Sequence, residues 1–199
     1  ACKGGEASPP RSVFEPMNPL LQRGGLPPFD QITPELVGPA MLQLLTEADR
    51  TRVLTVAVSL AGAGGFAAGA FVADGEGDAY DHDAYARAMA EVSEAGGTPV
   101  LFPSWGLAAL DEAEWVAAQE RLGSGVDRFI AFELGDMFVP YGRIYSLAAY
   151  RGLMGIPSCI GAKHSSLSRQ AEWARLALRN EVRSDFSVFT GNDLAIDMV

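Results

Sequence analysis

The sequence predicts an α/β protein built on a parallel β-sheet. From residue 84 onward, short apolar runs alternate with segments of helical periodicity. Strands that alternate with helices of about 10 to 15 residues imply right-handed crossovers between parallel strands. The chain has 199 residues, 48% of them hydrophobic, which is typical of a globular domain with a sizeable core. A closed eight-stranded barrel usually needs about 250 residues, so the sheet is either open or part of a barrel.

The first part of the chain has a less regular pattern. Residues 1–40 hold eight of the 12 prolines and predict an irregular Pro/Gly-rich arm, followed by one domain over residues 41–199. Pro39 opens a predicted short helix that runs to Ala48. The apolar run from Arg52 to Leu60 predicts a buried strand. A glycine-rich, then acidic, stretch follows, and Asp81 or Asp83 is expected to cap the next helix.

The remaining elements alternate regularly, and their ends carry the expected signals. Gly96 and Gly97, for example, supply the left-handed stop that commonly ends a helix. The predicted helices are 84–95, 111–122, 146–154 and 167–180, and the predicted strands are 99–102, 128–134, 159–163 and 186–190.

Composition excludes several classes of partner. The formal net charge is −10 and no basic stripe is visible, which excludes nucleic acid as the main partner. Glycines interrupt the apolar stretches, so no membrane span is expected. The two cysteines, Cys2 and Cys159, provide neither a disulfide framework nor zinc spacing. We therefore expect a cytoplasmic protein.

Lys163 is the leading candidate for a reactive residue. Only two of the 15 basic residues are lysines, and Lys163 lies near the carboxyl end of a predicted buried strand. That end of a parallel strand is where α/β proteins bind ligands. A desolvated lysine can lose its proton and attack a carbonyl carbon, which arginine cannot do. The alternative is a solvated charge or the partner of a carboxylate.

Three motifs resemble the dihydrodipicolinate synthase and N-acetylneuraminate lyase superfamily from about residue 98 to 199. Gly161-Ala162-Lys163-His164-Ser165-Ser166 is similar to its sixth-strand lysine pattern. Phe189-Thr190-Gly191-Asn192-Asp193 is similar to its seventh-strand pattern, and Phe129 to Glu133 takes the place of its fifth strand. The resemblance implies a parallel (β/α)8 TIM barrel, incomplete in this chain. It also implies a lyase, aldolase or hydro-lyase that holds pyruvate or another small 2-oxo acid as a Schiff base, without a cofactor.

The chain departs from that family in three places. The fifth strand of the family usually delivers a tyrosine that relays protons, whereas the matching positions here are Phe132 and Glu133. The family's second-strand turn that binds the substrate carboxylate has only a loose substitute at 59–65. The eighth strand and the carboxy-terminal helices have no counterpart.

Schiff-base chemistry needs an amine, a proton shuttle and donors for the substrate carboxylate. Lys163 is predicted as the amine. Glu133 is predicted either as acid or base or as an ion-pair partner of Lys163. Tyr141 or Tyr145 could restore the missing hydroxyl unless its ring is simply packed. The predicted substrate-binding residues are Arg143, Thr190, Gly191 and Asn192; Arg143 could instead form a surface salt bridge, and Asn192 could cap a helix. His164 is expected on the opposite side of the strand from Lys163.

Two other functions compete with the lyase hypothesis. A barrel-derived binding or structural protein could have kept the scaffold and lost the chemistry. A metal-dependent barrel enzyme could use Glu133 and Asp136 as ligands, although neither of the two histidines is well placed. No metal is expected in the favoured hypothesis. Apolar edges left by the missing strands favour a homo-oligomer.

Overall fold

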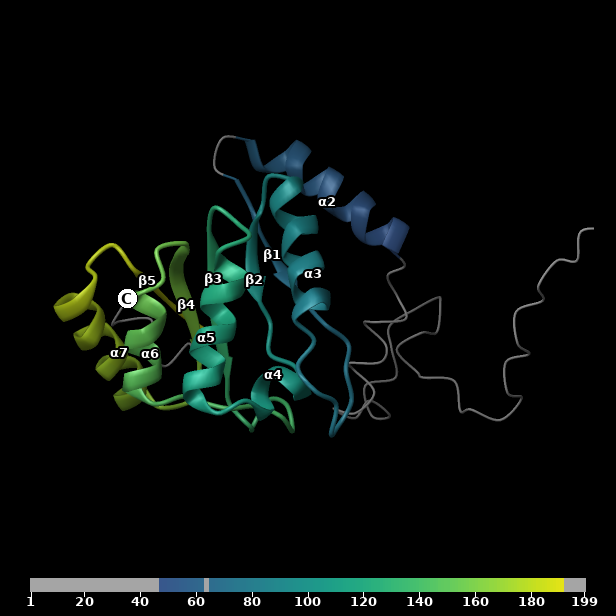
Figure 1. Cartoon of the computed structure of the whole chain (residues 1–199). Coiled ribbons are helices and arrows are strands. Elements are labelled where there is room, and N and C mark those ends of the chain that lie inside the picture. The colour runs from purple at the N-terminus through teal and green to yellow at the C-terminus, as the bar shows by residue number, and fades with distance from the viewer. Residues whose placement is uncertain (1–46, 63–64, 192–199) are drawn as a thin grey trace, which may run out of the picture. The chain divides into compact units, whose positions relative to one another are not determined.

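The computed structural model describes residues 47–62 and 65–191. The chain divides into two units, Ala1–Ala48 and Asp49–Val199, and the second of them contains the sheet. Five parallel strands form this sheet in chain order (Figure 1). They are β1 (Ala67–Ala70), β2 (Thr98–Leu101), β3 (Phe129–Leu134), β4 (Cys159–Ser165) and β5 (Ser187–Thr190). This arrangement confirms the predicted parallel sheet.

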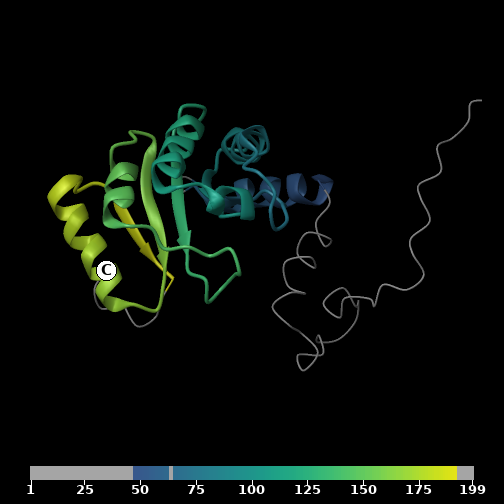
Figure 2. The same ribbon diagram turned by 60° about the horizontal axis from the view of Figure 1, so that its bottom comes forward.

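Helices cover one face of the sheet, because successive right-handed crossovers all return on the same side (Figures 1 and 2). They are α3 (His82–Glu94), α5 (Glu112–Gly123), α6 (Leu147–Met154) and α7 (Arg169–Val182), and a short α4 (Trp105–Ala109) follows β2. Asp81 caps α3, as predicted, by accepting a hydrogen bond from the amide of Ala84. Asp111, Ser146 and Ser168 cap α5, α6 and α7 in the same way.

The hydrophobic core lies between the sheet and these helices. Alternate strand residues such as Phe129, Ala131 and Ala162 meet Trp115 of α5 and Tyr150 of α6 there. The helix side of the sheet therefore takes one set of alternating side chains, and the other set lies on the opposite face.

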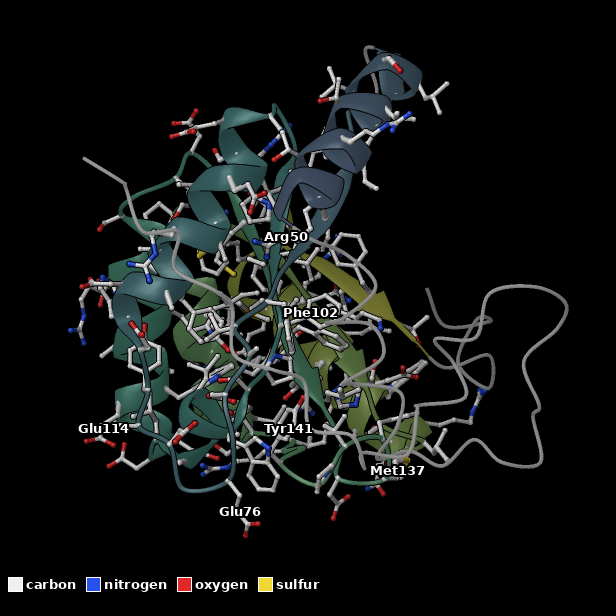
Figure 3. All side chains as sticks on the ribbon, turned by 90° about the vertical axis from the view of Figure 1, so that its right-hand side faces the viewer. Arg50, Glu76, Phe102, Glu114, Met137 and Tyr141 are labelled. Atoms are coloured by element: carbon white, nitrogen blue, oxygen red, sulfur yellow. The ribbon has the colours of Figure 1, made fainter. Side chains whose placement is uncertain are left out.

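We call that opposite face the inner face; it carries Gly69, Phe102, Phe132, Gly161, Lys163 and Phe189. The Phe102 and Phe132 rings meet edge to face with centroids 5.0 Å apart, and Figure 3 labels Phe102 on this side. A Cβ atom on Gly69 would lie 2.9 Å from the Phe102 ring, and one on Gly161 would lie 2.8 Å from the Phe189 ring. At Gly69 the Phe102 ring occupies this space, and at Gly161 the backbone carbonyl of Ser187 is closer still, at 2.5 Å, so glycine is needed there.

The predicted strand at 52–60 is wrong. These residues belong to helix α2 (Glu47–Ala61), and the partly buried residues Leu54, Ala57 and Ala61 follow helical rather than strand spacing. Val53, Val56 and Leu60 form a second stripe that is 54%, 50% and 81% exposed. Alternating valines raise strand propensity, but a strand forms only with a neighbour to pair with.

The first strand was missed for the converse reason. β1 consists of Ala-Ala-Gly-Ala, and small residues give no strand signal, yet it pairs with β2 from Ala67 to Ala70. The short helix α4 was also missed. The predicted helix at 39–48 and the arm at 1–40 lie outside the described residues, apart from the last two positions of the helix.

Among the described residues, no helix has the length and apolarity to cross a membrane.

Candidate active site

Lys163 lies on β4, between β3 and β5. Its backbone is in register with Phe132 of β3 and Phe189 of β5, and both pairings are parallel. This confirms that the lysine strand lies between the strands that carry Glu133 and Thr190. The amine nitrogen of Lys163 is 4.2 Å from the centroid of the Phe132 ring. The lysine therefore lies on the inner face, near the carboxyl end of its strand.

Partial burial makes the neutral form of Lys163 easier to reach than in water. Partial burial removes water from the ammonium group and lowers the pKa of Lys163 from its ordinary value. Within the described part of the chain, no carboxylate forms an ion pair with it. At any given pH, more of this amine is deprotonated than for a solvated lysine, and the deprotonated amine is the nucleophile.

Gly191 lies beside the lysine, and Ser165 leaves no room for a side chain at this position. A Cβ atom at this position would lie 3.4 Å from the Lys163 amine nitrogen, 3.2 Å from its Cε and 2.6 Å from Ser165 Oγ. The amide of Gly191 donates a hydrogen bond to the His164 carbonyl at 3.3 Å, which holds the backbone there. The structure thus brings together two of the predicted site residues, Lys163 and Gly191.

Glu133 lies on the other face of the sheet, so the expectation that it neighbours the Lys163 amine is corrected. One side-chain oxygen accepts hydrogen bonds from His164 Nδ1 at 2.6 Å and from Arg175 Nε. The other accepts from Arg175 Nη2 at 3.0 Å and from the Tyr145 amide at 3.1 Å. The reason is strand alternation: Glu133 follows Phe132, and consecutive strand residues point to opposite faces. It can neither pair with the lysine nor serve it as a base from there.

His164 completes a buried polar network on the helix side. It is fully buried, with Nδ1 on Glu133 and Nε2 at 2.7 Å from Ser166 Oγ. The position confirms that His164 points away from Lys163. Burial alone would raise the pKa of Glu133, but the hydrogen bonds from His164 and Arg175 and the charge of Arg175 outweigh it, so the pKa lies below its ordinary value.

Tyr141 and Arg143 lie on the loop after β3, beside α4. The Tyr141 ring packs against Trp105 with centroids 5.2 Å apart, and burial, with a smaller effect of Asp74, raises its pKa. Arg143 donates to the carbonyl of Leu110 at 2.7 Å and to that of Ala108 at 3.4 Å. Both side chains therefore have packing or hydrogen-bond partners at the end of α4, and no contact joins either of them to Lys163 among the described residues.

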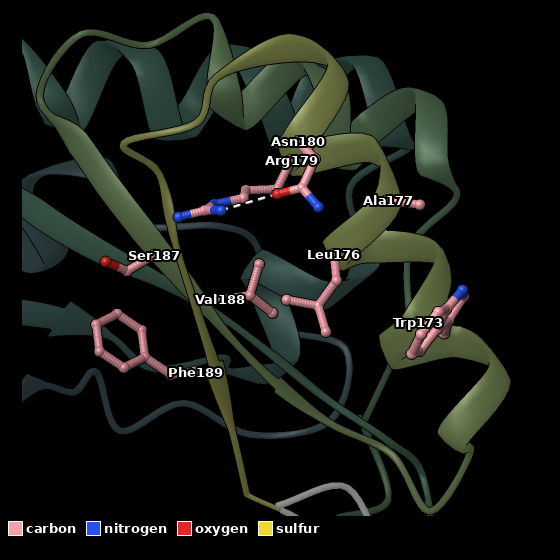
Figure 4. A pocket seen from close by; sticks show the side chains of 8 residues that line it. All are labelled: Trp173, Leu176, Ala177, Arg179, Asn180, Ser187, Val188 and Phe189. Atoms are coloured by element: carbon pink, nitrogen blue, oxygen red, sulfur yellow. Dashed lines mark hydrogen bonds between the residues drawn. The ribbon is translucent and has the colours of Figure 1, made fainter. Parts of the chain in front are cut away.

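Two predicted residues remain. Thr190 is in register with His164 and donates a hydrogen bond to Glu172 of α7, so it faces the helix layer rather than the lysine. Asn192 lies outside the described residues. A cavity of about 610 Å³ runs along β5 and α7 and is lined by residues such as Trp173, Leu176 and Val188 (Figure 4). Lys163 is not among its lining residues.

The proposed metal ligands are not grouped. Arg175 and His164 already occupy both oxygens of Glu133 together with the Tyr145 amide. Over residues 47–62 and 65–191, no three side chains of His, Cys, Asp or Glu come together as a possible metal site.

Solved structures share this fold, although no family profile and no curated protein matches the sequence. Dihydrodipicolinate synthase from Thermotoga maritima gives a TM-score of 0.61 at 13% identity, over 77% of this chain and 50% of that one. A prophage protein of the dihydrodipicolinic acid synthase family from E. coli K12, in complex with pyruvate, gives 0.61 at 12% identity, over 77% and 49%. A monomeric dihydrodipicolinate synthase variant gives 0.63 at 12% identity, also over 77% and 49%.

The described unit has the dihydrodipicolinate synthase fold. The chain spans about half the length of the solved structures that it matches, which agrees with a TIM barrel that is incomplete in this chain. Both the resemblance and the fold class predicted from the sequence are thereby confirmed.

Two further residues of the site stand beside the lysine. Phe132 stands where the family usually has a tyrosine, and its ring lies under the lysine amine. Ser165 follows Lys163 by two residues on the same face, and it was not among the residues predicted from the sequence. Its position could have been found from the period of two along β4, which places residues 161, 163 and 165 on one side.

Proposed function

We propose that this chain carries the Schiff-base lysine of a lyase, aldolase or hydro-lyase that acts on pyruvate or another small 2-oxo acid. The observation that supports the proposal is the partly desolvated Lys163 amine on the inner face, 3.4 Å from the position that a Cβ atom on Gly191 would take. The pyruvate complex of the E. coli K12 protein indicates the class of ligand.

The chemistry follows from an amine that no carboxylate of the described residues holds in an ion pair. The neutral Lys163 nitrogen attacks the ketone carbon of the 2-oxo acid and forms a carbinolamine, which loses water to give the imine. A proton must move from nitrogen to oxygen in this sequence. Glu133 is on the wrong face for that transfer.

The test is reductive trapping. Wild-type protein treated with pyruvate and borohydride is expected to gain one reduced pyruvyl group, detected by intact mass and located on Lys163 by peptide mapping. Lys163→Ala should gain none, and Lys163→Arg should be inert because guanidinium stays protonated. Lys3→Ala, which removes the only other lysine, is the matched control and should be trapped like wild type. A folded wild type that shows no adduct with several 2-oxo acids contradicts the proposal.

The second candidate is a catalytically silent binding protein. Phe132 in place of the family tyrosine and the helix-side position of Glu133 favour it. Calorimetric binding of pyruvate without any trapped adduct would support this candidate over the lyase.

We further propose a cytoplasmic homo-oligomer. Helix α2 exposes the stripe of Val53, Val56 and Leu60, and α7 exposes Trp173 at 62%. A second copy that covered such surfaces would remove apolar area from water. Light scattering is expected to give a mass above that of one chain, and a monodisperse monomer would contradict this assembly.

A further inference from the structure

Ser165 presents a buried hydroxyl without a hydrogen-bond partner among the described residues. The residue is 4% exposed, and its Oγ is buried and unsatisfied within residues 47–62 and 65–191. A buried polar atom left unsatisfied costs about 1–3 kcal/mol, so native structures rarely keep one without a reason. The backbone of Ser165 is held in place, since its carbonyl accepts a hydrogen bond from the Gly135 amide at 2.9 Å.

This hydroxyl lies at the lysine. A Cβ atom built on Gly191 would be 2.6 Å from Ser165 Oγ and 3.4 Å from the Lys163 amine nitrogen. The distance between Ser165 Oγ and the Lys163 amine nitrogen therefore cannot exceed about 6 Å, the sum of their distances to that Cβ position. This upper limit is compatible with one carbonyl group that meets both atoms.

Two other hydroxyl-bearing residues near the sheet, Ser166 and Tyr141, have partners away from the lysine amine. Ser166 Oγ is bonded to His164 on the helix side, and Tyr141 packs on Trp105 beside α4. Phe132, whose ring lies under the amine, has no hydroxyl. The inner face also carries Ser187, but Ser187 is in register with Gly161, two positions before the partner of Lys163. Ser165 is the hydroxyl that lies, together with the lysine amine, around the Gly191 position.

We propose that Ser165 Oγ relays a proton during attack of the Lys163 amine on a 2-oxo acid, an inference that rests on the function proposed above. Attack forms the C–N bond and leaves a positive nitrogen that bears two protons beside a negative oxygen. Ser165 donates its own proton to that oxygen and accepts one from the nitrogen, which leaves a neutral carbinolamine and an unchanged serine. A hydroxyl between the two atoms replaces a strained direct transfer, and no other reagent is consumed.

The experiment measures the rate of adduct formation with pyruvate, at borohydride concentrations where the rate no longer depends on the reductant. Ser165→Ala is expected to lower this rate about 100-fold, while Lys163 is still trapped to the same final extent. Ser165→Thr, which keeps the hydroxyl, should restore most of the rate. The pH profile of Ser165→Ala should keep the midpoint of wild type, below the ordinary lysine value, with a lower plateau, because the lysine is unchanged.

Thermal stability separates a relay from a packing role. Ser165→Ala removes an unsatisfied hydroxyl, so its melting temperature should equal or exceed that of wild type. Ser166→Ala is the matched control: it should lose stability through the His164 network but keep the trapping rate of the folded protein. Wild-type rates in Ser165→Ala overturn the proposal, as does a rate loss that Ser165→Thr fails to restore. A wild type without any adduct would instead refute the proposed function.

Discussion

Arg175→Ala is expected to lower the free energy of unfolding by about 3–5 kcal/mol at neutral pH, because it leaves the buried Glu133 carboxylate without its charged partner. Arg175 and Glu133 are both almost completely buried, and Arg175 also donates to the Tyr145 carbonyl at 2.8 Å. The network joins β3, β4, α7 and the loop before α6. Denaturant titration followed by circular dichroism measures the loss.

The matched control is Arg151→Ala. Arg151 and Glu181 form an ion pair at 2.9 Å with side chains that are 49% and 68% exposed, and such surface pairs contribute less than about 1 kcal/mol. A double variant, Glu133→Gln with Arg175→Leu, removes both charges and should be less destabilised than Arg175→Ala. Equal losses for Arg175→Ala and Arg151→Ala would mean that the buried pair does not stabilise the fold.

The loss in free energy of unfolding caused by Arg175→Ala should become smaller as the pH falls. The pKa of Glu133 lies below its ordinary value in the folded protein, so its contribution to stability is present above the unfolded pKa and disappears as pH falls through the folded one. In Arg175→Ala the buried carboxyl is easier to protonate, which favours the folded state of the variant in acid. Denaturant titrations at neutral and mildly acidic pH should therefore show that the free energies of unfolding of wild type and Arg175→Ala converge as the pH falls.

Gly191→Ala is expected to slow pyruvate trapping by about 10- to 100-fold while the protein stays folded. The backbone of Gly191 is not in the left-handed region, so alanine adds no backbone strain there. Its methyl group would take the space 2.6 Å from Ser165 Oγ and 3.2 Å from Lys163 Cε. The lysine must then shift, and a nucleophile displaced by about 1 Å loses much of its rate.

Gly125→Ala provides the control for the glycine substitution itself. Its new methyl group would meet only the Leu122 carbonyl, at an ordinary 3.5 Å. Trapping rates and melting temperatures are compared for the two variants and wild type. If Gly191→Ala is trapped as fast as Gly125→Ala, the contact between Gly191 and Lys163 has no part in the reaction.

The regular part of the fold could be predicted because each of its elements carries its own signal. The strands around Ile130 and Ala162 are apolar runs of strand length, and the helices between them have caps and stop signals at both ends. β1 could not be predicted, since its residues are small where the Phe102 ring packs on them, a contact that is distant in sequence. The alternating valines of α2 predicted a strand, but such a segment forms a strand only where a neighbouring strand can pair with it.

The site was predicted only in part, for a similar reason. The proximity of Lys163 and Gly191 could be predicted because both lie at the carboxyl ends of adjacent parallel strands. Glu133 was placed on the right strand but on the wrong face, because its prediction relied on the strand end rather than on the alternation from Phe132. Tyr141 and Arg143 lie on a loop whose path is set by α4, a helix that the sequence did not predict.

Consecutive side chains of β4 point to opposite faces of the sheet, so the residues on one face can change in evolution independently of those on the other. Ala162 and His164 meet the helix layer, whereas Gly161, Lys163 and Ser165 meet the inner face. An exchange at Lys163 or Ser165 leaves the helix-layer contacts of Ala162 and His164 in place. An exchange at Ala162 or His164 alters core packing or the buried polar network and leaves the inner-face side chains unchanged. One strand of seven residues thus holds two sets of positions that selection can act on independently.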